Sequence, residues 1–215
     1  MLYYANPSSG LVRDAMAAGL LGCITTPKQG NRIPDGAMYA CDNGKFGKGW
    51  PGGDRWFAWL ARTVERYGRE RCAWAVAPDV PFDAQGTLAE SSEWLPKIRS
   101  LGIPVAFAAQ DGSEEPGMIP WDEVDVVFLA GSTEWKIGPD AQYVSAEAKR
   151  RGKGVHMGRV NSLRRMRIAE RFRCDSADGT YLTFGRTTNL PKLLHWVSRV
   201  NDVLVTIDEA EGVAS

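Results

Sequence analysis

The sequence lacks the patterns that mark several common functional classes. Its four cysteines are widely separated, with no Cys-x-x-Cys pair and no Cys/His cluster. The sequence therefore signals neither a zinc site nor a disulfide framework, and we expect buried free thiols. The formal net charge is zero, so the overall electrostatic field does not favour nucleic acid.

Long apolar runs are also missing. No stretch approaches the roughly 18 apolar residues of a membrane span. The first residues, 1–7, lack the basic region and following apolar run of a signal peptide. These absences predict a cytoplasmic protein without a membrane partner.

Eight short apolar segments alternate mostly with helical patterns along the chain. This alternation predicts parallel β/α units, and eight strands close a (β/α)8 TIM-type barrel. The link over residues 27–36 is rich in Gly and Pro and has no helical pattern, so we expect a compact and somewhat irregular barrel. We predict a single barrel domain over residues 1–207 and a flexible tail over 208–215. The predicted strands are Leu2–Ala5, Leu20–Thr26, Ala37–Cys41, Cys72–Ala77, Pro104–Ala109, Asp125–Ala130, Gly154–Met157 and Arg173–Asp175.

Positive charge is concentrated in one stretch. Between Lys149 and Arg173 there are ten Lys or Arg residues and one acid, Glu170. Such a stripe on a neutral protein fits the binding of an anion at one place. A solvated helix face is the alternative reading. The candidates for phosphate contacts are Arg159, Arg164, Arg165 and Arg167.

Polar side chains, and in one case a glycine, follow or end several of the predicted strands. In strand order from the third to the eighth they are Asp42, Asp79, Gln110, Gly131, His156 and Asp175. The carboxyl ends of barrel strands meet at one mouth, where the active site lies. Two carboxylates can perform acid–base and nucleophilic chemistry at a glycosidic carbon, whereas three could bind a divalent metal. Asp175 or Asp178 could instead cap a turn.

The ordered set of motifs resembles the tRNA-guanine transglycosylase superfamily. It is most similar to the small phage members that place 7-deazaguanine bases in DNA. Residues 42–46, Asp-Asn-Gly-Lys-Phe, resemble the family's Asp-Ser-Gly-Gly-Phe segment. Residues 78–81 and 109–112 resemble its base-reading Asp and Gln segments, and residues 129–131 resemble its glycine step. Residues 156–158, a helix and residues 172–175 resemble its Leu-Met-Gly, helix and Phe-Asp-Cys passage.

The resemblance implies a role for each of these residues. Asp42 would be the general acid/base and Asp175 the nucleophile. The implied substrate-binding residues are Asp79, Gln110, Gly131 and Ser132, with the backbone of the glycine step approaching the base. Phe46 and His156 are further candidates for substrate binding. Phe46 could stack on a base or pack in the core, and His156 could orient a carboxylate, touch a phosphate or be a buried hydrogen-bonded residue. No cofactor and no metal are expected.

The implied activity is that of a pentosyltransferase that exchanges guanine in DNA for a 7-deazaguanine base, such as 7-cyano-7-deazaguanine. The family's tRNA enzymes carry a zinc-binding Cys/His cluster and long insertions, which this chain lacks, so tRNA is a less favoured partner than DNA. A phage-encoded protein would act in the host cytoplasm. Three alternatives stay open: an N-glycosylase that hydrolyses the bond in DNA or nucleosides, a non-catalytic barrel that binds a purine or nucleic acid, and a metal-dependent hydrolase.

Overall fold

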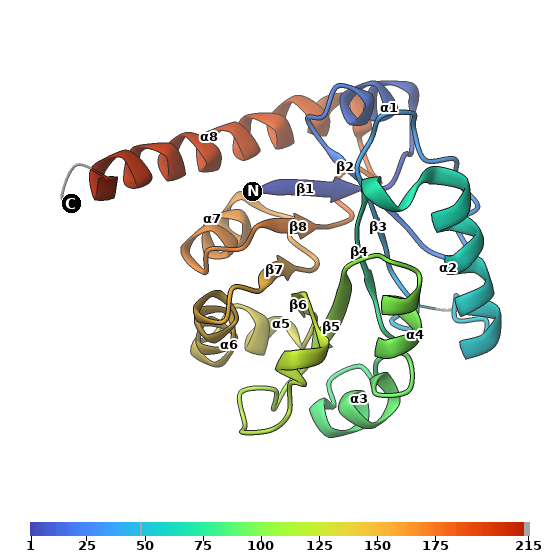
Figure 1. The fold of residues 1–215 in the computed structure, drawn as a ribbon. Helices are drawn as coiled ribbons and strands as arrows, with labels where there is room; N and C mark the ends of the chain where they lie inside the picture. The colour runs from blue at the N-terminus through green and yellow to red at the C-terminus, as the bar shows by residue number, and fades with distance from the viewer. Residues whose placement is uncertain (48, 213–215) are drawn as a thin grey trace.

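The protein is a closed barrel of eight parallel strands, in the order β1 to β8, with helices around the outside (Figure 1). This computed structural model describes residues 1–47 and 49–212, with side chains described up to residue 202. The predicted (β/α)8 fold is confirmed. The strands are β1 Leu2–Ala5, β2 Gly22–Thr25, β3 Tyr39–Cys41, β4 Cys72–Val76, β5 Val105–Ala109, β6 Val126–Leu129, β7 Gly154–Met157 and β8 Ser176–Asp178.

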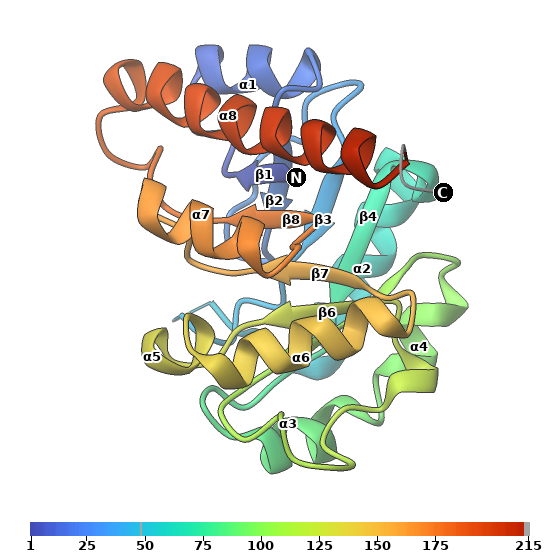
Figure 2. The same ribbon diagram turned by 90° about the vertical axis from the view of Figure 1, so that its left-hand side faces the viewer.

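The helices cover the outer face of the strands, as the apolar stripes of their sequences predict. Figure 2 shows the barrel from the side, with the carboxyl ends of the strands on the left, beside α5. The helices are α1 Gly10–Ala17, α2 Gly53–Tyr67, α3 Ala84–Ser91, α4 Leu95–Ser100, α5 Thr133–Lys136, α6 Pro139–Arg150, α7 Leu163–Arg171 and α8 Arg186–Gly212, with short 3₁₀ helices at Arg69–Arg71 and Trp121–Glu123.

Strands β1 to β7 lie within two residues of their predicted boundaries, whereas β8 is shifted. Residues 84–100 form two helices, α3 and α4. The link between β2 and β3 has no helix, as expected. Helix α8 continues through the start of the predicted tail to Gly212, because no Gly or Pro interrupts residues 192–211. The rest of the predicted tail, 213–215, lies outside the described residues.

Strand β8 begins three residues later than predicted. Its last residue is therefore Asp178, whereas the prediction placed Asp175 at the end of this strand. Arg173 adopts a left-handed backbone with φ 57°, directly after α7. The N–H of Cys174 donates to the Ala169 carbonyl at 2.9 Å, which closes the end of that helix. Glycine usually supplies this turn. Because Arg occupies it here, the sequence gives no sign that residues 173–174 belong to a helix end.

The inside of the barrel is filled by aromatic and small apolar side chains. They form a cluster separate from the larger core between strands and helices, and its members are Tyr4, Ile24, Ala40, Trp74, Val76, Ala106, Ala108 and Phe128. The ring of His156 lies among them, with its centroid 4.6 Å from that of Trp74 and 4.7 Å from that of Phe128. This packed interior leaves the carboxyl end of the barrel as the place where polar side chains gather.

The four cysteines are free and buried. In the described part of the chain, no helix has the length and apolar character needed to cross a membrane.

Candidate active site

A pocket of ≈ 180 Å³ opens at the carboxyl end of the strands. Its lining comes from strands β4, β5, β6 and β8 and from the loops after β3 to β7, as expected for a barrel mouth. Three carboxylates, two amides and a guanidinium line it together with apolar side chains. The lining residues are Asp42, Asn43, Phe46, Val76, Asp79, Ala108, Gln110, Phe128, Ala130, Gly158, Arg159 and Asp178.

Asp178 is the carboxylate that β8 contributes to the mouth. It is the last residue of the strand, and alternation along β8 turns Ser176 and Asp178 inward and Ala177 outward. Its Oδ1 lies 3.1 Å from His156 Nε2 and accepts the Arg159 N–H at 3.3 Å. Among the described residues, nothing donates a hydrogen bond to Oδ2, so this oxygen is available to a substrate in the pocket.

A glycine directly after the neighbouring strand β7 makes room for this carboxylate. A Cβ on Gly158 would stand 2.5 Å from Phe128 Cε2 and 3.3 Å from Asp178 Oδ1. Any side chain there would therefore displace the wall of the pocket and the carboxylate together.

Asp42 is the second carboxylate of the pocket, at the end of β3. Its Oδ1 accepts the Gly44 N–H at 2.7 Å. Burial raises the pKa of Asp42 to about 7, and the charges of Asp178 and Asp79 act in the same direction, whereas the bond from Gly44 opposes them. A carboxyl group with such a pKa can both give and take a proton near neutral pH.

Asp79 and Gln110 form a fixed hydrogen-bonding edge on another wall. Asn43 Nδ2 donates to Asp79 Oδ1 at 2.8 Å, and Gln110 Nε2 donates to Asp79 Oδ2 at 2.6 Å. Gln110 Oε1 accepts the Phe82 N–H at 2.9 Å. Burial raises the pKa of Asp79, whereas the bond from Asn43 lowers it. Each group keeps unused capacity toward the pocket: a second lone pair on each carboxylate oxygen and one amide N–H.

The prediction that Asp175 faces the mouth is wrong. Asp175 lies before β8, at the amino-terminal end of the barrel, and its side chain is 55% exposed. Lys149 Nζ lies 2.5 Å from Asp175 Oδ2, and the same oxygen accepts the Val155 N–H at 2.7 Å. Asp125 accepts the N–H of Val105 in the same way, at 2.8 Å. Asp175 and Asp125 thus have the same structural role: each accepts a backbone N–H near the start of a neighbouring strand, β7 and β5 respectively.

The predicted role of the Gly131–Ser132 backbone is also contradicted. The Gly131 N–H donates to the Ala109 carbonyl at 3.1 Å, and the Ser132 N–H donates to Asp111 Oδ1 at 2.6 Å. Neither N–H is left for a base. Glycine is needed at 131 for packing, since a Cβ would stand 2.6 Å from both Asp111 Oδ1 and Trp135 Cε3.

His156 supports the site without lining it. The residue is fully buried, with Nδ1 2.8 Å from Ser176 Oγ and Nε2 3.1 Å from Asp178 Oδ1. Of the roles expected for His156, the geometry supports a buried residue that orients a carboxylate, here Asp178, and not a residue that contacts substrate.

Lys136 is a buried cation that the sequence analysis missed. It is 0% exposed, and its Nζ has no hydrogen-bond partner among the residues that the structure describes. Burial lowers the pKa of Lys136 to about 7; the charges of Arg159 and Arg165 lower it further, whereas Asp178 and Asp111 raise it. The segment Thr-Glu-Trp-Lys reads as an exposed helical turn, so nothing in the sequence marks this burial.

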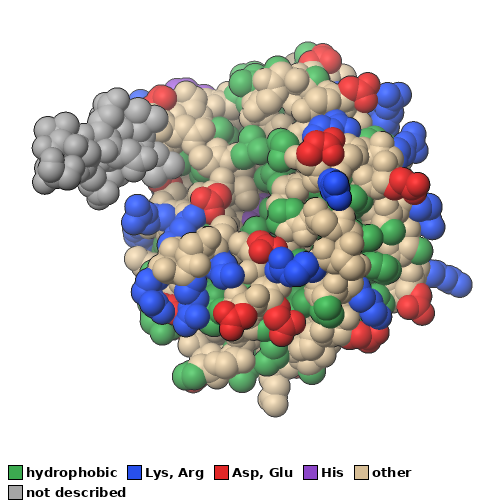
Figure 3. Space-filling view, viewed as in Figure 1, with side chains coloured by type: hydrophobic (Ala, Val, Ile, Leu, Met, Phe, Trp, Pro, Cys, Tyr) green, Lys and Arg blue, Asp and Glu red, His purple; other side chains and the backbone are tan. Residues whose placement is uncertain are grey.

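The basic stretch divides between the two ends of the barrel. Figure 3, seen from the amino-terminal end, shows Lys and Arg side chains gathered over α6 and α7. Arg150 and Arg151 pair there with Glu147, as Lys149 does with Asp175.

The predicted phosphate-binding arginines lie in three different places. Arg159 lines the pocket at the mouth. Arg164 and Arg165 line a cavity of ≈ 420 Å³ between α5 and α7. Arg167 faces another cavity, between α7 and α8. Arg164 and Arg165 are therefore the pair that extends basic character beyond the pocket.

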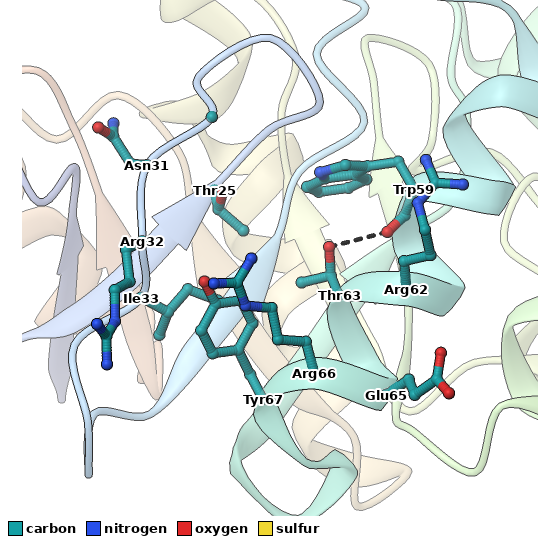
Figure 4. Close-up of a pocket in the computed structure, with 11 residues that line it drawn as sticks. Thr25, Asn31, Arg32, Ile33, Trp59, Arg62, Thr63, Glu65, Arg66 and Tyr67 are labelled. Atoms are coloured by element: carbon teal, nitrogen blue, oxygen red, sulfur yellow. Dashed lines mark hydrogen bonds between the residues drawn. The ribbon is translucent and has the colours of Figure 1, made fainter.

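A larger cavity, of ≈ 560 Å³, lies on the outside of the barrel between α2 and the loop after β2 (Figure 4). Trp59, Arg62, Arg66 and Tyr67 contribute to its lining. Glu65 is the sole carboxylate among the lining residues, and Figure 4 shows it pointing away from the others. The mouth pocket, with its convergent carboxylates, is the better candidate for chemistry despite its smaller volume.

No group of three or more His, Cys, Asp or Glu side chains in the described residues is arranged to hold a metal ion. Asp79 is instead engaged by two amides, and Asp178 by His156 and a backbone N–H.

No protein-family model and no curated protein matches this chain. Solved structures match its fold. A designed cube-shaped porous protein cage aligns with TM-score 0.59 and 12% identity over 100% of this chain and 77% of that chain. A native KDPGal structure aligns with TM-score 0.58 and 12% identity over 95% and 96%. An HpcH/HpaI aldolase from Desulfitobacterium hafniense DCB-2 aligns with TM-score 0.55 and 11% identity over 89% and 92%. At these identities the likeness concerns the barrel fold alone.

Proposed function

We propose that the protein is an enzyme that exchanges guanine in DNA for a 7-deazaguanine base, with Asp178 as the nucleophile. The observation behind this proposal is that one pocket contains both a pair of carboxylates and a hydrogen-bonding edge. Asp178 and Asp42 supply a carboxylate pair, and Asp79 with Gln110 supplies a hydrogen-bonding edge that suits a purine. The resemblance to guanine transglycosylases supports it, with the nucleophile moved from Asp175 to Asp178.

The hydrogen-bonding edge matches guanine in its donor and acceptor pattern. Asp79 can accept the ring N–H and the amino group of the base. The second N–H of Gln110 Nε2 can donate to the base oxygen, because its first N–H is held by Asp79 and its Oε1 by Phe82. A 7-deazaguanine presents the same edge, so one pocket can hold both bases in turn.

In the first half-reaction, Asp178 Oδ2 attacks C1′ of the deoxyribose while the bond from C1′ to guanine N9 breaks. The electron pair of that bond leaves with guanine, and the protonated Asp42 carboxyl donates a proton to it. The product is a covalent ester between Asp178 and C1′. His156, bound to Oδ1, keeps the other oxygen directed at the sugar.

In the second half-reaction, Asp42 as a carboxylate takes the N9 proton of the 7-deazaguanine. The base nitrogen attacks C1′ and Asp178 leaves as a carboxylate. Two displacements at C1′ give net retention of configuration. The target nucleotide must leave the base stack to reach the pocket.

The direct test measures the exchange of radiolabelled guanine into double-stranded DNA, with tRNA and free nucleosides assayed in parallel. Exchange on DNA supports the proposal. Abasic sites that accumulate when no base is supplied would mean an N-glycosylase. Purine binding without release or exchange on any substrate would mean a non-catalytic barrel, and activity lost to a chelator would mean a metal-dependent hydrolase.

The raised pKa of Asp42 predicts opposite pH dependences for the two half-reactions. A carboxyl with a pKa of about 7 is protonated below that pH and ionised above it. Formation of the covalent adduct, which needs the acid form, should fall about tenfold per pH unit above about pH 7. Attack by the incoming base, which needs the carboxylate, should fall below that pH. Single-turnover rates for each half, measured between about pH 6 and 8, check this prediction. Asp42→Asn should abolish both inflections, and parallel profiles for the two halves would contradict the assignment.

The division of the basic stretch predicts which arginines bind DNA. Arg164→Gln/Arg165→Gln should weaken DNA binding and reduce the slope of log K against log salt by about 2, since each lost phosphate contact removes about 0.9. Arg150→Gln/Arg151→Gln is the matched control at the other end of the barrel and should leave the slope unchanged. Fluorescence titrations at several salt concentrations measure both. Equal effects of the two pairs would mean that DNA does not approach from the mouth.

A further inference from the structure

Two exposed phenylalanines and an arginine stand at the edge of the mouth pocket. Phe46 is 62% exposed and Phe82 is 48% exposed. Their ring centroids are 5.9 Å apart, with an interplanar angle of 89°. The Arg159 guanidinium lies 4.5 Å from the centroid of Phe46 and 5.9 Å from that of Phe82. We call these three residues the aromatic rim.

The rim is built on strained backbone. Phe82 has φ 67° and Arg159 has φ 59°, two of the three described non-glycine residues with positive φ. A residue held in this region costs about 1–3 kcal/mol and persists only where its surroundings fix it. Strain of this kind gathers at functional sites.

Hydrogen bonds hold Phe82 in place. Thr87 Oγ1 accepts the Val80 N–H at 2.9 Å and donates to the Val80 carbonyl at 3.0 Å, and Ser91 Oγ donates to the Pro78 carbonyl at 2.8 Å. The Phe82 N–H itself donates to Gln110 Oε1. An exposed phenyl ring is thus carried on a rigid loop and connected directly to the hydrogen-bonding edge of the pocket.

In the free protein, the exposed rings of Phe46 and Phe82 contribute little to the stability of the fold. Burying a phenylalanine side chain is worth about 1.5–3 kcal/mol, and both rings forgo much of it. The Arg159 guanidinium already donates through Nη2 to the Ala130 and Gly131 carbonyls, and its other N–H groups can bind an anion. A partner that offers flat apolar faces next to negative charge would cover the rings and pair with this guanidinium. Stacked nucleobases with their phosphates have this chemistry.

We propose that the aromatic rim is a wedge that enters the base stack of double-stranded DNA, with Phe82 filling the space that the extruded guanine leaves. This inference rests on the proposed function and specifies its substrate class as base-paired DNA. Extrusion costs the energy of unpairing and unstacking, and stacking on Phe82 offsets part of it. The bond from Phe82 to Gln110 places the wedge at a fixed distance from the pocket that receives the base.

The test compares Phe82→Ala with the wild type on three DNAs of one sequence: paired duplex, duplex with the target guanines mismatched, and single strand. We expect exchange to fall about 10- to 100-fold on the paired duplex, the loss of one stacking contact. On the mismatched and single-stranded DNA, where unpairing is already done, exchange should stay within about threefold of the wild type. Phe82→Leu keeps an apolar side chain and should recover part of the loss.

Tyr143→Ala removes an exposed aromatic side chain on α6 and is the control, with exchange expected to match the wild type on all three DNAs. Equal losses on all three DNAs would overturn the inference, since Phe82 would then shape the pocket only.

A second measurement separates this inference from the proposed reaction. Duplexes carrying 2-aminopurine beside guanines report unstacking as a rise in fluorescence when protein binds, without any exchange. We expect the rise with the wild type and its loss with Phe82→Ala. If the wild type gives the rise but no exchange, the proposed reaction fails and the wedge stands. If it gives exchange without the rise, the wedge fails and the reaction stands.

Discussion

Asp178→Asn should abolish guanine exchange, by about 10⁴-fold or more, because an amide oxygen cannot serve as the nucleophile that forms the sugar ester. The amide oxygen can still accept from His156, so the fold and base binding should persist. Guanine exchange and the covalent protein–DNA adduct on a denaturing gel are the two measurements. The substitution puts asparagine before Gly179, a pair that deamidates readily back to aspartate, so Asp178→Ala is measured beside it.

Asp175→Asn is the matched control, three residues away on the same segment. It removes the charge that pairs with Lys149, at the opposite end of the barrel. The side chain is 55% exposed, so we expect a stability loss of at most about 1 kcal/mol and activity close to that of the wild type. An inactive Asp175→Asn together with an active Asp178→Asn would return the nucleophile to residue 175.

Lys136→Met should stabilise the protein strongly at neutral and acidic pH. The lysine is fully buried, and no described residue forms a hydrogen bond with its Nζ; burial lowers its pKa from 10.5 to about 7. The unfolded chain therefore binds a proton that the folded chain does not between these two values. In the wild type, stability contributed by this group rises with pH through that window and is lowest below about pH 7. The fall in pKa corresponds to at most about 5 kcal/mol.

Thermal and urea unfolding at several pH values test this prediction. Lys136→Met should raise Tm by about 10 °C near pH 6. Its advantage over the wild type should shrink as the pH rises toward 10. Lys192→Met, on the exposed face of α8, should show neither effect. A gain that does not change with pH would mean that packing, and not the buried charge, is responsible.

Lys136 also interacts electrostatically with residues of the mouth pocket. The charges that act on its pKa include Arg159 at the pocket and Asp178, so this buried amine lies near the proposed nucleophile. A buried ionisable group with a strongly shifted pKa is a common mark of functional sites. The cost predicted for Lys136 is thus of the kind that enzymes sustain at active sites.

Much of the fold and part of the site were predictable from the amino-acid order. The eight strands alternate with helical stripes, and both periodicities are local properties of the chain. Asp42, Asp79 and Gln110 were found because each lies just after an apolar strand, and parallel strands bring such positions to one edge.

Three features were decided only in the folded structure. The left-handed turn at Arg173 shifts β8 by three residues, which moves Asp178 to the mouth and Asp175 to the far end. The N–H groups of Gly131 and Ser132 are taken by Ala109 and Asp111, which no local pattern reveals.

The third feature is the division of the basic stretch. Residues 149–173 run from the end of α6 through β7 and α7, so they pass from the amino-terminal end of the barrel to its mouth and back. Local periodicity determines which segments become strands and helices, because it depends on neighbours a few residues apart. Register, burial and the end of the barrel that each charge occupies depend on contacts between distant segments, and only the closed barrel decides them.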